Sequence, residues 1–306
     1  MTNKIFILLG PTASGKSQLS IKLSKDFPFE IINADLFSIY KGLNIGTAKP
    51  SGEDLQTTKH YLINKLEPDR NYNVSKFCSD VDQSIKSIYS KKRIPLIVGG
   101  SMMYIYQLLN GLTHEYNLSD SDRELIKFIK SKYSDVDLYH ALKSDSSISI
   151  EKISINDSYR LEKLIERLIT VKSNKKKYCG LNNNNNTKVY ILFINVSDRD
   201  ILKKNIHKRT KHMVESGLIE EVRNLKHTYK LTHGSQSMKA IGYRETLDFL
   251  NGESSIDNLI SAISTSTQQL AKRQMTWKNK FNIDYCINYP SYEYDSICDF
   301  ITDTIR

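Results

Sequence analysis

The stretch GPTASGKS, Gly10–Ser17, matches the pattern G-x-x-x-x-G-K-[ST] of a phosphate-binding loop. A short apolar run, Ile5–Leu9, precedes it like a buried parallel strand, and a helical pattern follows it. Between a strand and a helix, the N–H groups of such a loop wrap around a di- or triphosphate, and its lysine supplies a positive charge. The residues we expect to contact the phosphates are Gly10, Pro11, Thr12, Ala13, Ser14, Gly15, Lys16 and Ser17. We also expect the Ser17 hydroxyl to hold a Mg²⁺ ion.

Two more buried-strand patterns follow the loop. They cover Glu30–Ala34 and Arg93–Val98, and a helical pattern over residues 75–90 separates them. This alternation predicts an α/β fold with a P-loop NTPase-like three-layer core and a parallel sheet. Ligands of such sheets bind beyond the carboxyl ends of the strands, so the loops that begin at Asp35 and Gly99 should meet the phosphate-binding loop in one cleft.

The pattern changes in the middle of the chain. Residues 113–186 carry helical periodicity and end in five consecutive asparagines, Asn182–Asn186, which predict a surface loop. A strand pattern returns at Val189–Ile194, and the rest of the chain appears helical in its periodicity. We therefore predict a helical insertion domain at 113–186 in a core formed by 1–112 and 187–306 with a helical C-terminal part.

Composition limits the class of protein. The chain has 306 residues, 39% of them hydrophobic, and no apolar stretch long enough to cross a membrane. The four cysteines lie far apart, which argues against a zinc site or a disulfide framework and predicts a cytoplasmic protein. The net charge of +10 fits a polyanionic partner such as nucleic acid, but it fits a lysine-rich composition or a solubility charge equally well.

Two candidate catalytic groups follow strand ends. Asp35 could take a proton from a nucleophile or hold Mg²⁺ through water, but it could also cap a turn. Gly99 and Gly100 stand where many ATPases have a Mg²⁺-binding aspartate, which weakens a prediction of nucleotide hydrolysis, and Ser101 offers a hydroxyl there.

Basic side chains gather at several places. Arg160, Lys163 and Arg167 share one face of a predicted helix, which could bind a phosphate backbone or simply face solvent beside Glu162 and Glu166. The other candidate RNA contacts are Lys239, Arg244, Lys272 and Arg273, with Tyr243 and Trp277 as nearby rings for base stacking.

Eight short motifs spread over nearly the whole chain carry a resemblance to one family. They are GPTASGKS, INAD (Ile32–Asp35), IYKGLNIGTAKP (Ile39–Pro50), RIPLIVGGS (Arg93–Ser101), IND-x-x-R (Ile155–Arg160), MVESGLIEEV (Met213–Val222), MKAIGYRE (Met238–Glu245) and LAKRQMTW (Leu270–Trp277). In this combination the chain resembles the tRNA dimethylallyltransferases, also called tRNA isopentenyltransferases.

The resemblance implies a specific reaction. A dimethylallyl group moves from dimethylallyl diphosphate to N6 of the adenosine 3′ of the anticodon, in tRNAs that read codons starting with U, and diphosphate leaves with the help of Mg²⁺. The tRNA would bind through its anticodon stem-loop with the target base flipped out. The protein would act as a cytoplasmic monomer with no membrane contact.

The resemblance also implies roles for individual residues. Asp35 would be the base, Lys16 and Arg209 would bind the diphosphate, and Ser101 would stand where the family usually has threonine. The implied tRNA contacts are Asp35, Leu36, Phe37, Ser38, Ser101, Arg123, Tyr159, Arg160, Leu161, Glu162 and Lys163. The chain departs from the family at residues 36–38, where Ser-x-Gln is usual, and at Lys163 and Gln268, where arginine is usual.

Two alternatives stay open at this point. A prenyl transferase acting on free adenine nucleotides would share the phosphate loop and Asp35, although it would not need the basic C-terminal half. A P-loop kinase, or a nucleotide-dependent RNA binder without catalysis, would bind ATP tightly or hydrolyse it.

Overall fold

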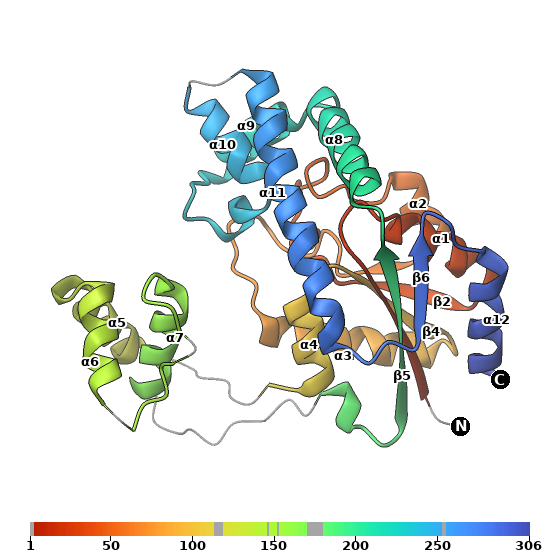
Figure 1. The fold of residues 1–306 in the computed structure, drawn as a ribbon, viewed down its shortest axis with the longest axis horizontal. Helices are drawn as coiled ribbons and strands as arrows, with labels where there is room; N and C mark the ends of the chain where they lie inside the picture. The colour runs from red at the N-terminus through yellow and green to blue at the C-terminus, as the bar shows by residue number, and fades with distance from the viewer. Residues whose placement is uncertain (1–2, 113–118, 146, 152, 170–179, 253–254) are drawn as a thin grey trace. The chain divides into compact units, whose positions relative to one another are not determined.

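The computed structural model divides the chain into two compact units, each described here by itself (Figure 1). The core unit comprises Met1–Gly111 and Cys179–Arg306, and the insertion unit comprises Leu112–Tyr178. The prediction put the return to the core at residue 187, whereas the structure already assigns the preceding asparagine-rich turn to the core unit. The structure describes residues 3–112, 119–145, 147–151, 153–169, 180–252 and 255–306.

A parallel sheet of six strands forms the centre of the core unit, in the order β3-β2-β4-β1-β5-β6. The strands are β1 (Asn3–Leu9), β2 (Phe29–Asn33), β3 (His60–Tyr61), β4 (Ile94–Gly99), β5 (Thr187–Val196) and β6 (Tyr285–Tyr289). This architecture confirms the predicted α/β fold with a parallel sheet.

Helices of the core unit cover the sheet and extend beyond the carboxyl ends of β5 and β6, where α8, α9 and α10 lie (Figure 1). They are α1 (Lys16–Asp26), α2 (Gly52–Thr57), α3 (Val74–Ser90), α4 (Met102–Asn110), α8 (Arg199–Glu215), α9 (Leu218–Tyr229), α10 (Tyr243–Leu250), α11 (Ile256–Trp277) and α12 (Tyr294–Ile305). Short 3₁₀ helices occur at Leu181–Asn183, Gln236–Lys239 and Lys278–Lys280.

The central strand β1 is apolar throughout because both faces of the sheet are covered. Phe6 and Leu8 pack into a cluster with side chains of α1, α8, α11 and α12, and Phe6 meets the ring of Phe29 edge-on with 5.2 Å between ring centroids. Ile5 and Ile7 point to the other face, as alternation in a strand requires, and are fully buried. The helices α3 and α4 pack against each other, and α3 packs on β2 and β4.

Glycine allows two close approaches in the core unit. A Cβ atom on Gly99 would lie 2.2 Å from the carbonyl oxygen of Ala34, so only glycine lets the end of β4 touch the end of β2. A Cβ atom on Gly180 would lie 2.4 Å from the amide nitrogen of Gly111, so the chain leaves the core unit and returns to it at one place.

The insertion unit contains three helices among its described residues: α5 (Asp120–Lys132), α6 (Asp135–Ser144) and α7 (Ser158–Ile169). Ser119 and Ser134 each start a helix with a capping box, in which the serine hydroxyl and the aspartate three residues later bond each other's backbone N–H. The amphipathic pattern of α7 turns Leu161 and Ile165 inward, where they pack with Ile126 and Ile150.

The prediction of a wholly helical C-terminal part was wrong. Residues Tyr285–Tyr289 form β6, which extends the sheet beyond β5 as its last strand. The strand has only five residues, and its stability depends on pairing with β5, which lies far earlier in the sequence. Among the described residues, no helix is both long and apolar enough to cross a membrane.

The contact at Gly99 generates a prediction about stability. We expect Gly99→Ala to lower the free energy of unfolding by ~1–3 kcal/mol, because backbone atoms cannot move aside easily for the added methyl group. Urea denaturation measures the change. The control Gly52→Ala adds a methyl group where no atom lies within 4 Å, so it should stay within ~0.5 kcal/mol of the parent protein. Equal stability of both variants would contradict the close approach.

Candidate active site

The phosphate-binding loop takes the expected place between β1 and α1. Gly15 adopts a left-handed conformation with φ of +82° at the start of α1, which a residue with a side chain rarely tolerates. The Ser14 hydroxyl donates to the carbonyl oxygen of Pro11 at 2.8 Å and so ties the loop to itself. The loop thereby brings backbone N–H groups and the start of a helix to a cavity of about 720 Å³.

We call this cavity the loop pocket, because residues 12–18 line one side of it. A second cavity of about 510 Å³, the helix pocket, is lined by Ser266, Gln269, Arg273 and Trp277 of α11. The two pockets share part of their walls, so they meet inside the core unit. The shared residues are Thr12, Asp35, Thr47, Gly100, Arg209, Leu270 and Gln274.

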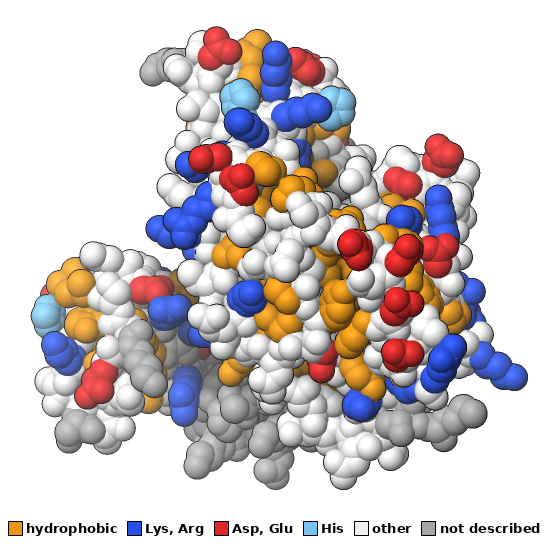
Figure 2. All heavy atoms as spheres, turned by 45° about the vertical axis from the view of Figure 1, so that its right-hand side comes forward, with side chains coloured by type: hydrophobic (Ala, Val, Ile, Leu, Met, Phe, Trp, Pro, Cys, Tyr) orange, Lys and Arg blue, Asp and Glu red, His pale blue; other side chains and the backbone are white. Residues whose placement is uncertain are grey.

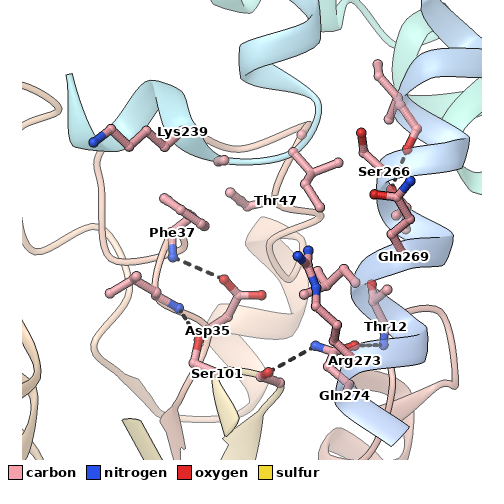
Figure 3. A pocket seen from close by; sticks show the side chains of 18 of the residues that line it. Thr12, Asp35, Phe37, Thr47, Ser101, Lys239, Ser266, Gln269, Arg273 and Gln274 are labelled. Carbon is pink, nitrogen blue, oxygen red and sulfur yellow. Dashed lines mark hydrogen bonds between the residues drawn. The ribbon is translucent and has the colours of Figure 1, made fainter. Parts of the chain in front are cut away.

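Asp35 lies at this junction, directly after β2. One of its carboxylate oxygens accepts a hydrogen bond from the backbone N–H of Phe37 at 3.1 Å, which fixes the start of the loop (Figure 3). The Ser101 hydroxyl accepts from the backbone N–H of Leu36 at 2.9 Å. Asp35 and Ser101 are therefore neighbours although 66 residues separate them in the sequence, and Gln269, Arg273 and Gln274 face them from α11 (Figure 3).

Lys16 is held inside the loop pocket. Its Nζ donates to the carbonyl oxygen of Pro11 at 2.6 Å. The pKa of Lys16 is lowered to about 7, mainly by burial and also by the nearby charge of Arg209, while Asp35 acts in the opposite direction. Burial also lowers the pKa of Arg209. Two cations that form no ion pair with the described residues therefore stand in one pocket, near Asp35, an arrangement that favours an anionic ligand.

Two helices hold Thr12 of the phosphate loop. Arg209 of α8 donates to its hydroxyl at 2.9 Å, and the carboxamide oxygen of Gln274 of α11 accepts from its backbone N–H at 2.7 Å. The Gln274 nitrogen donates to the carbonyl oxygen of Gly100 at 3.0 Å. Gln274 belongs to the motif LAKRQMTW, but the sequence predicts no role for it, because its partners lie 262 and 174 residues away.

The loop that carries Thr47 has an anchor that the sequence did not predict. The Glu221 carboxylate of α9 accepts from the backbone N–H groups of Asn44 and Ile45 at 3.0–3.1 Å. The buried Tyr243 hydroxyl donates to Glu221 at 2.5 Å and accepts from the N–H of Gly46 at 3.2 Å. Helices α9 and α10 therefore fix this loop beside the two pockets.

The predicted RNA contacts of the core unit fall into three groups. Leu36, Phe37, Ser101 and the cations Lys239, Arg244 and Arg273 line the helix pocket. Ser38 is buried and lines the loop pocket instead. Lys272 is exposed on α11 and does not belong to the lining of either pocket.

The remaining predicted contacts belong to the insertion unit. Tyr159 is 71% exposed, Arg160 pairs with Asp157, and Lys163 bonds Glu166. Arg123 lies on α5, and Glu162 accepts from Lys130 at 2.5 Å. The expectation for Leu161 needs correction: its side chain is 1% exposed and packs in the core of the unit, so it cannot contact RNA without unfolding.

Acidic side chains form a cluster on one face of the core unit. Figure 2 shows them on the right-hand part of that face, with lysine and arginine side chains along its edge. The exposed aspartates Asp295, Asp299 and Asp303 all belong to α12. None of these three aspartates lines the loop pocket or the helix pocket.

The loop pocket offers oxygen atoms that suit Mg²⁺. Ser17, Asn33, Asp35 and Ser38 line it, and the described residues contain no group of three or more His, Cys, Asp or Glu side chains that could hold a metal ion by themselves. Mg²⁺ commonly takes one or two protein ligands and fills its remaining positions with water and substrate phosphates. The residues present fit an ion of this kind.

Comparison with known proteins identifies the family. A model described as IPP transferase matches residues 38–281. The chain belongs to the IPP transferase family. It is 35% identical to the tRNA dimethylallyltransferase of Thermoanaerobacter sp. (strain X514), covering 96% of this chain and 95% of that protein. It is also 35% identical to the tRNA dimethylallyltransferase of Francisella tularensis subsp. novicida (strain U112), covering 90% and 91%.

Solved structures of the IPP transferase family have the same fold. A tRNA delta(2)-isopentenylpyrophosphate transferase from Staphylococcus epidermidis superposes with a TM-score of 0.70 at 31% identity, covering 99% of this chain and 98% of that one. A eukaryotic dimethylallyltransferase acting on tRNA superposes with a TM-score of 0.81 at 24% identity, covering 99% and 80%.

The lowered pKa of Lys16 predicts how diphosphate binding depends on pH. A bound diphosphate stabilises the charged lysine, so the pKa rises on binding, and a proton must be taken up above about pH 7. We expect affinity for the unreactive isopentyl diphosphate to fall up to about tenfold for each pH unit from about 7.5 to about 9.5. Calorimetry in two buffers of different ionisation enthalpy measures the proton uptake. Lys16→Met should bind more weakly without this pH dependence, and a flat profile in the parent protein would refute the prediction.

The anchor at Glu221 predicts a second effect on stability. We expect Glu221→Ala to lower the free energy of unfolding by ~2 kcal/mol or more, because the N–H groups of Asn44 and Ile45 lose their acceptor. Glu220→Ala is the matched control, since Glu220 is exposed on the same helix and pairs with Arg223. Urea denaturation compares the two variants, and similar stabilities would show that Glu221 does not anchor the loop.

Proposed function

We propose that this IPP transferase moves a dimethylallyl group from dimethylallyl diphosphate to N6 of the adenosine 3′ of the anticodon in tRNAs that read codons starting with U. The observation that carries the proposal is the junction of the two pockets, where Asp35 and Arg209 belong to both walls. A diphosphate bound by the phosphate loop and a base entering through the helix pocket would meet beside Asp35. The names of the relatives support the same reaction.

The donor would bind in the loop pocket. As the bond between the allylic carbon and the diphosphate breaks, negative charge grows on the leaving group. Lys16, Arg209 and the N–H groups of the loop would stabilise that charge better than they stabilise the intact donor. Ser17 would hold Mg²⁺ with the diphosphate oxygens, and the ion would supply further charge neutralisation.

The acceptor would enter the helix pocket. The exocyclic amine of adenine is a weak nucleophile, and Asp35 at the junction would accept its proton as the new C–N bond forms. Lys239, Arg244 and Arg273 line this pocket and would contact the phosphates around a flipped base. The anticodon stem-loop is the partner we propose, with the reaction taking place in the cytoplasm and the chain acting as a monomer.

A transfer assay tests the proposal. Labelled dimethylallyl diphosphate and an anticodon stem-loop, with Mg²⁺ present, should yield a labelled adenosine, and chelation of the metal should slow the reaction. Asp35→Ala should lower kcat by about 10²-fold or more while stem-loop binding persists, as expected when a general base is removed. The absence of transfer beside an active relative would refute the proposal, and unchanged turnover of Asp35→Ala would refute the role of Asp35.

Free adenine nucleotides are the alternative acceptor, and AMP can be compared with the stem-loop in the same transfer assay. AMP could reach Asp35 through the helix pocket, but it would use few of the cations that line the pocket. We expect kcat/KM for AMP to be far below that for the stem-loop. Equal values would favour a nucleotide prenyl transferase, and ATP hydrolysis without prenyl transfer would favour a kinase or an ATP-dependent RNA binder.

A further inference from the structure

Gln274 is a buried polar residue to which the proposed reaction gives no role. It is 5% exposed, although α11 is a helix whose other polar residues largely face solvent or the helix pocket. Both ends of its carboxamide are bonded, the oxygen to the backbone N–H of Thr12 and the nitrogen to the carbonyl oxygen of Gly100 (Figure 3). One side chain thus joins the phosphate loop to the end of β4.

Each end of this bridge leads to a different reactant. On one side, Thr12 belongs to the loop that would hold the diphosphate, and Arg209 fixes its hydroxyl. On the other side, Gly100 precedes Ser101, which accepts from the N–H of Leu36 next to Asp35. We infer that Gln274 is a positioning residue that sets the distance between the bound diphosphate and the carboxylate that activates the amine. The inference rests on the proposed function and deepens it.

The geometry requires a glutamine at this position. An ionised glutamate could accept from Thr12 but could not donate to Gly100, and a leucine of similar size could do neither. Either change leaves a half-buried N–H or C=O group without its side-chain partner. A Cβ atom on Gly100 would lie 2.3 Å from the Gln274 nitrogen, so a side chain at residue 100 would push the carboxamide out of this position.

The effect should appear in kcat rather than in binding. Both ends of the Gln274 carboxamide are engaged by backbone groups, which leaves the charged contacts to the phosphates to other residues, and a shift of about 1 Å between reacting groups lowers rates by about 10²-fold. We expect Gln274→Leu to lower kcat by about 10²-fold, with KM for dimethylallyl diphosphate within about threefold of the parent value. The control Gln268→Leu makes the same change on the same helix, outside the lining of both pockets, and should leave kcat unchanged.

Two further variants separate positioning from a general loss of structure. Gln274→Glu regains the missing donor when its carboxyl is protonated, so its kcat relative to the parent should rise as pH falls. Gly100→Ala pushes the same carboxamide aside, so combining it with Gln274→Leu should cost little more than either change alone. Full additivity, or a constant ratio of kcat values across pH, would overturn the inference.

Amide hydrogen exchange gives a readout that needs no turnover. The N–H of Thr12 should exchange slowly in the parent protein and in Gln268→Leu, and faster in Gln274→Leu. If Gln274→Leu turns over like the parent, the inference is wrong while the proposed function stands. If the parent transfers no prenyl group, the proposed function is wrong. In that case, unchanged amide exchange at Thr12 in Gln274→Leu would show that the Gln274 bridge is wrong as well.

Discussion

The candidate site depends on the close contact between the ends of β2 and β4. The backbone N–H of Ala34 donates to Val98 at 2.7 Å, and the N–H of Ser101 donates back to Ala34 at 3.2 Å. Gly99 lies between these two bonds, and its missing side chain gives them room. Because the next residue after Ala34 is Asp35, this backbone contact brings the carboxylate and the Ser101 hydroxyl to one side of the helix pocket. The sheet therefore determines where Asp35 and Ser101 lie, and the loops determine only their finer geometry.

Parts of the fold that depend on local sequence were predictable. The loop Gly10–Ser17 has a spacing that only a phosphate-binding turn explains well, and β1 and β4 are apolar runs of strand length. Their parallel arrangement in one sheet followed from the strand and helix alternation, whereas the order of the strands was not predicted. The strand β6 was missed although Asp284 and Pro290 flank it, because five residues carry too little pattern to identify a strand, and pairing with β5 decides their conformation.

Site residues were predictable where nearby sequence fixes their position, and they were missed where contacts with distant residues define their role. Asp35 and Ser101 follow strands directly, so the rule for parallel sheets indicated where they meet. Gln274 and Glu221 bond backbone groups that lie more than 170 residues away, and nothing in helical periodicity says which N–H group a buried side chain will meet. Leu161 shows the reverse error: a residue inside a predicted contact motif serves the packing of its own helix.

The insertion unit leaves the core unit and returns to it at almost one point, since Gly111 and Gly180 lie against each other. No strand or helix of the sheet would have to be rerouted if the intervening segment were shortened, lengthened or replaced. The insertion unit could therefore be exchanged as a whole. Its size and surface could change without disturbing the strands that lead to Asp35 and the phosphate loop.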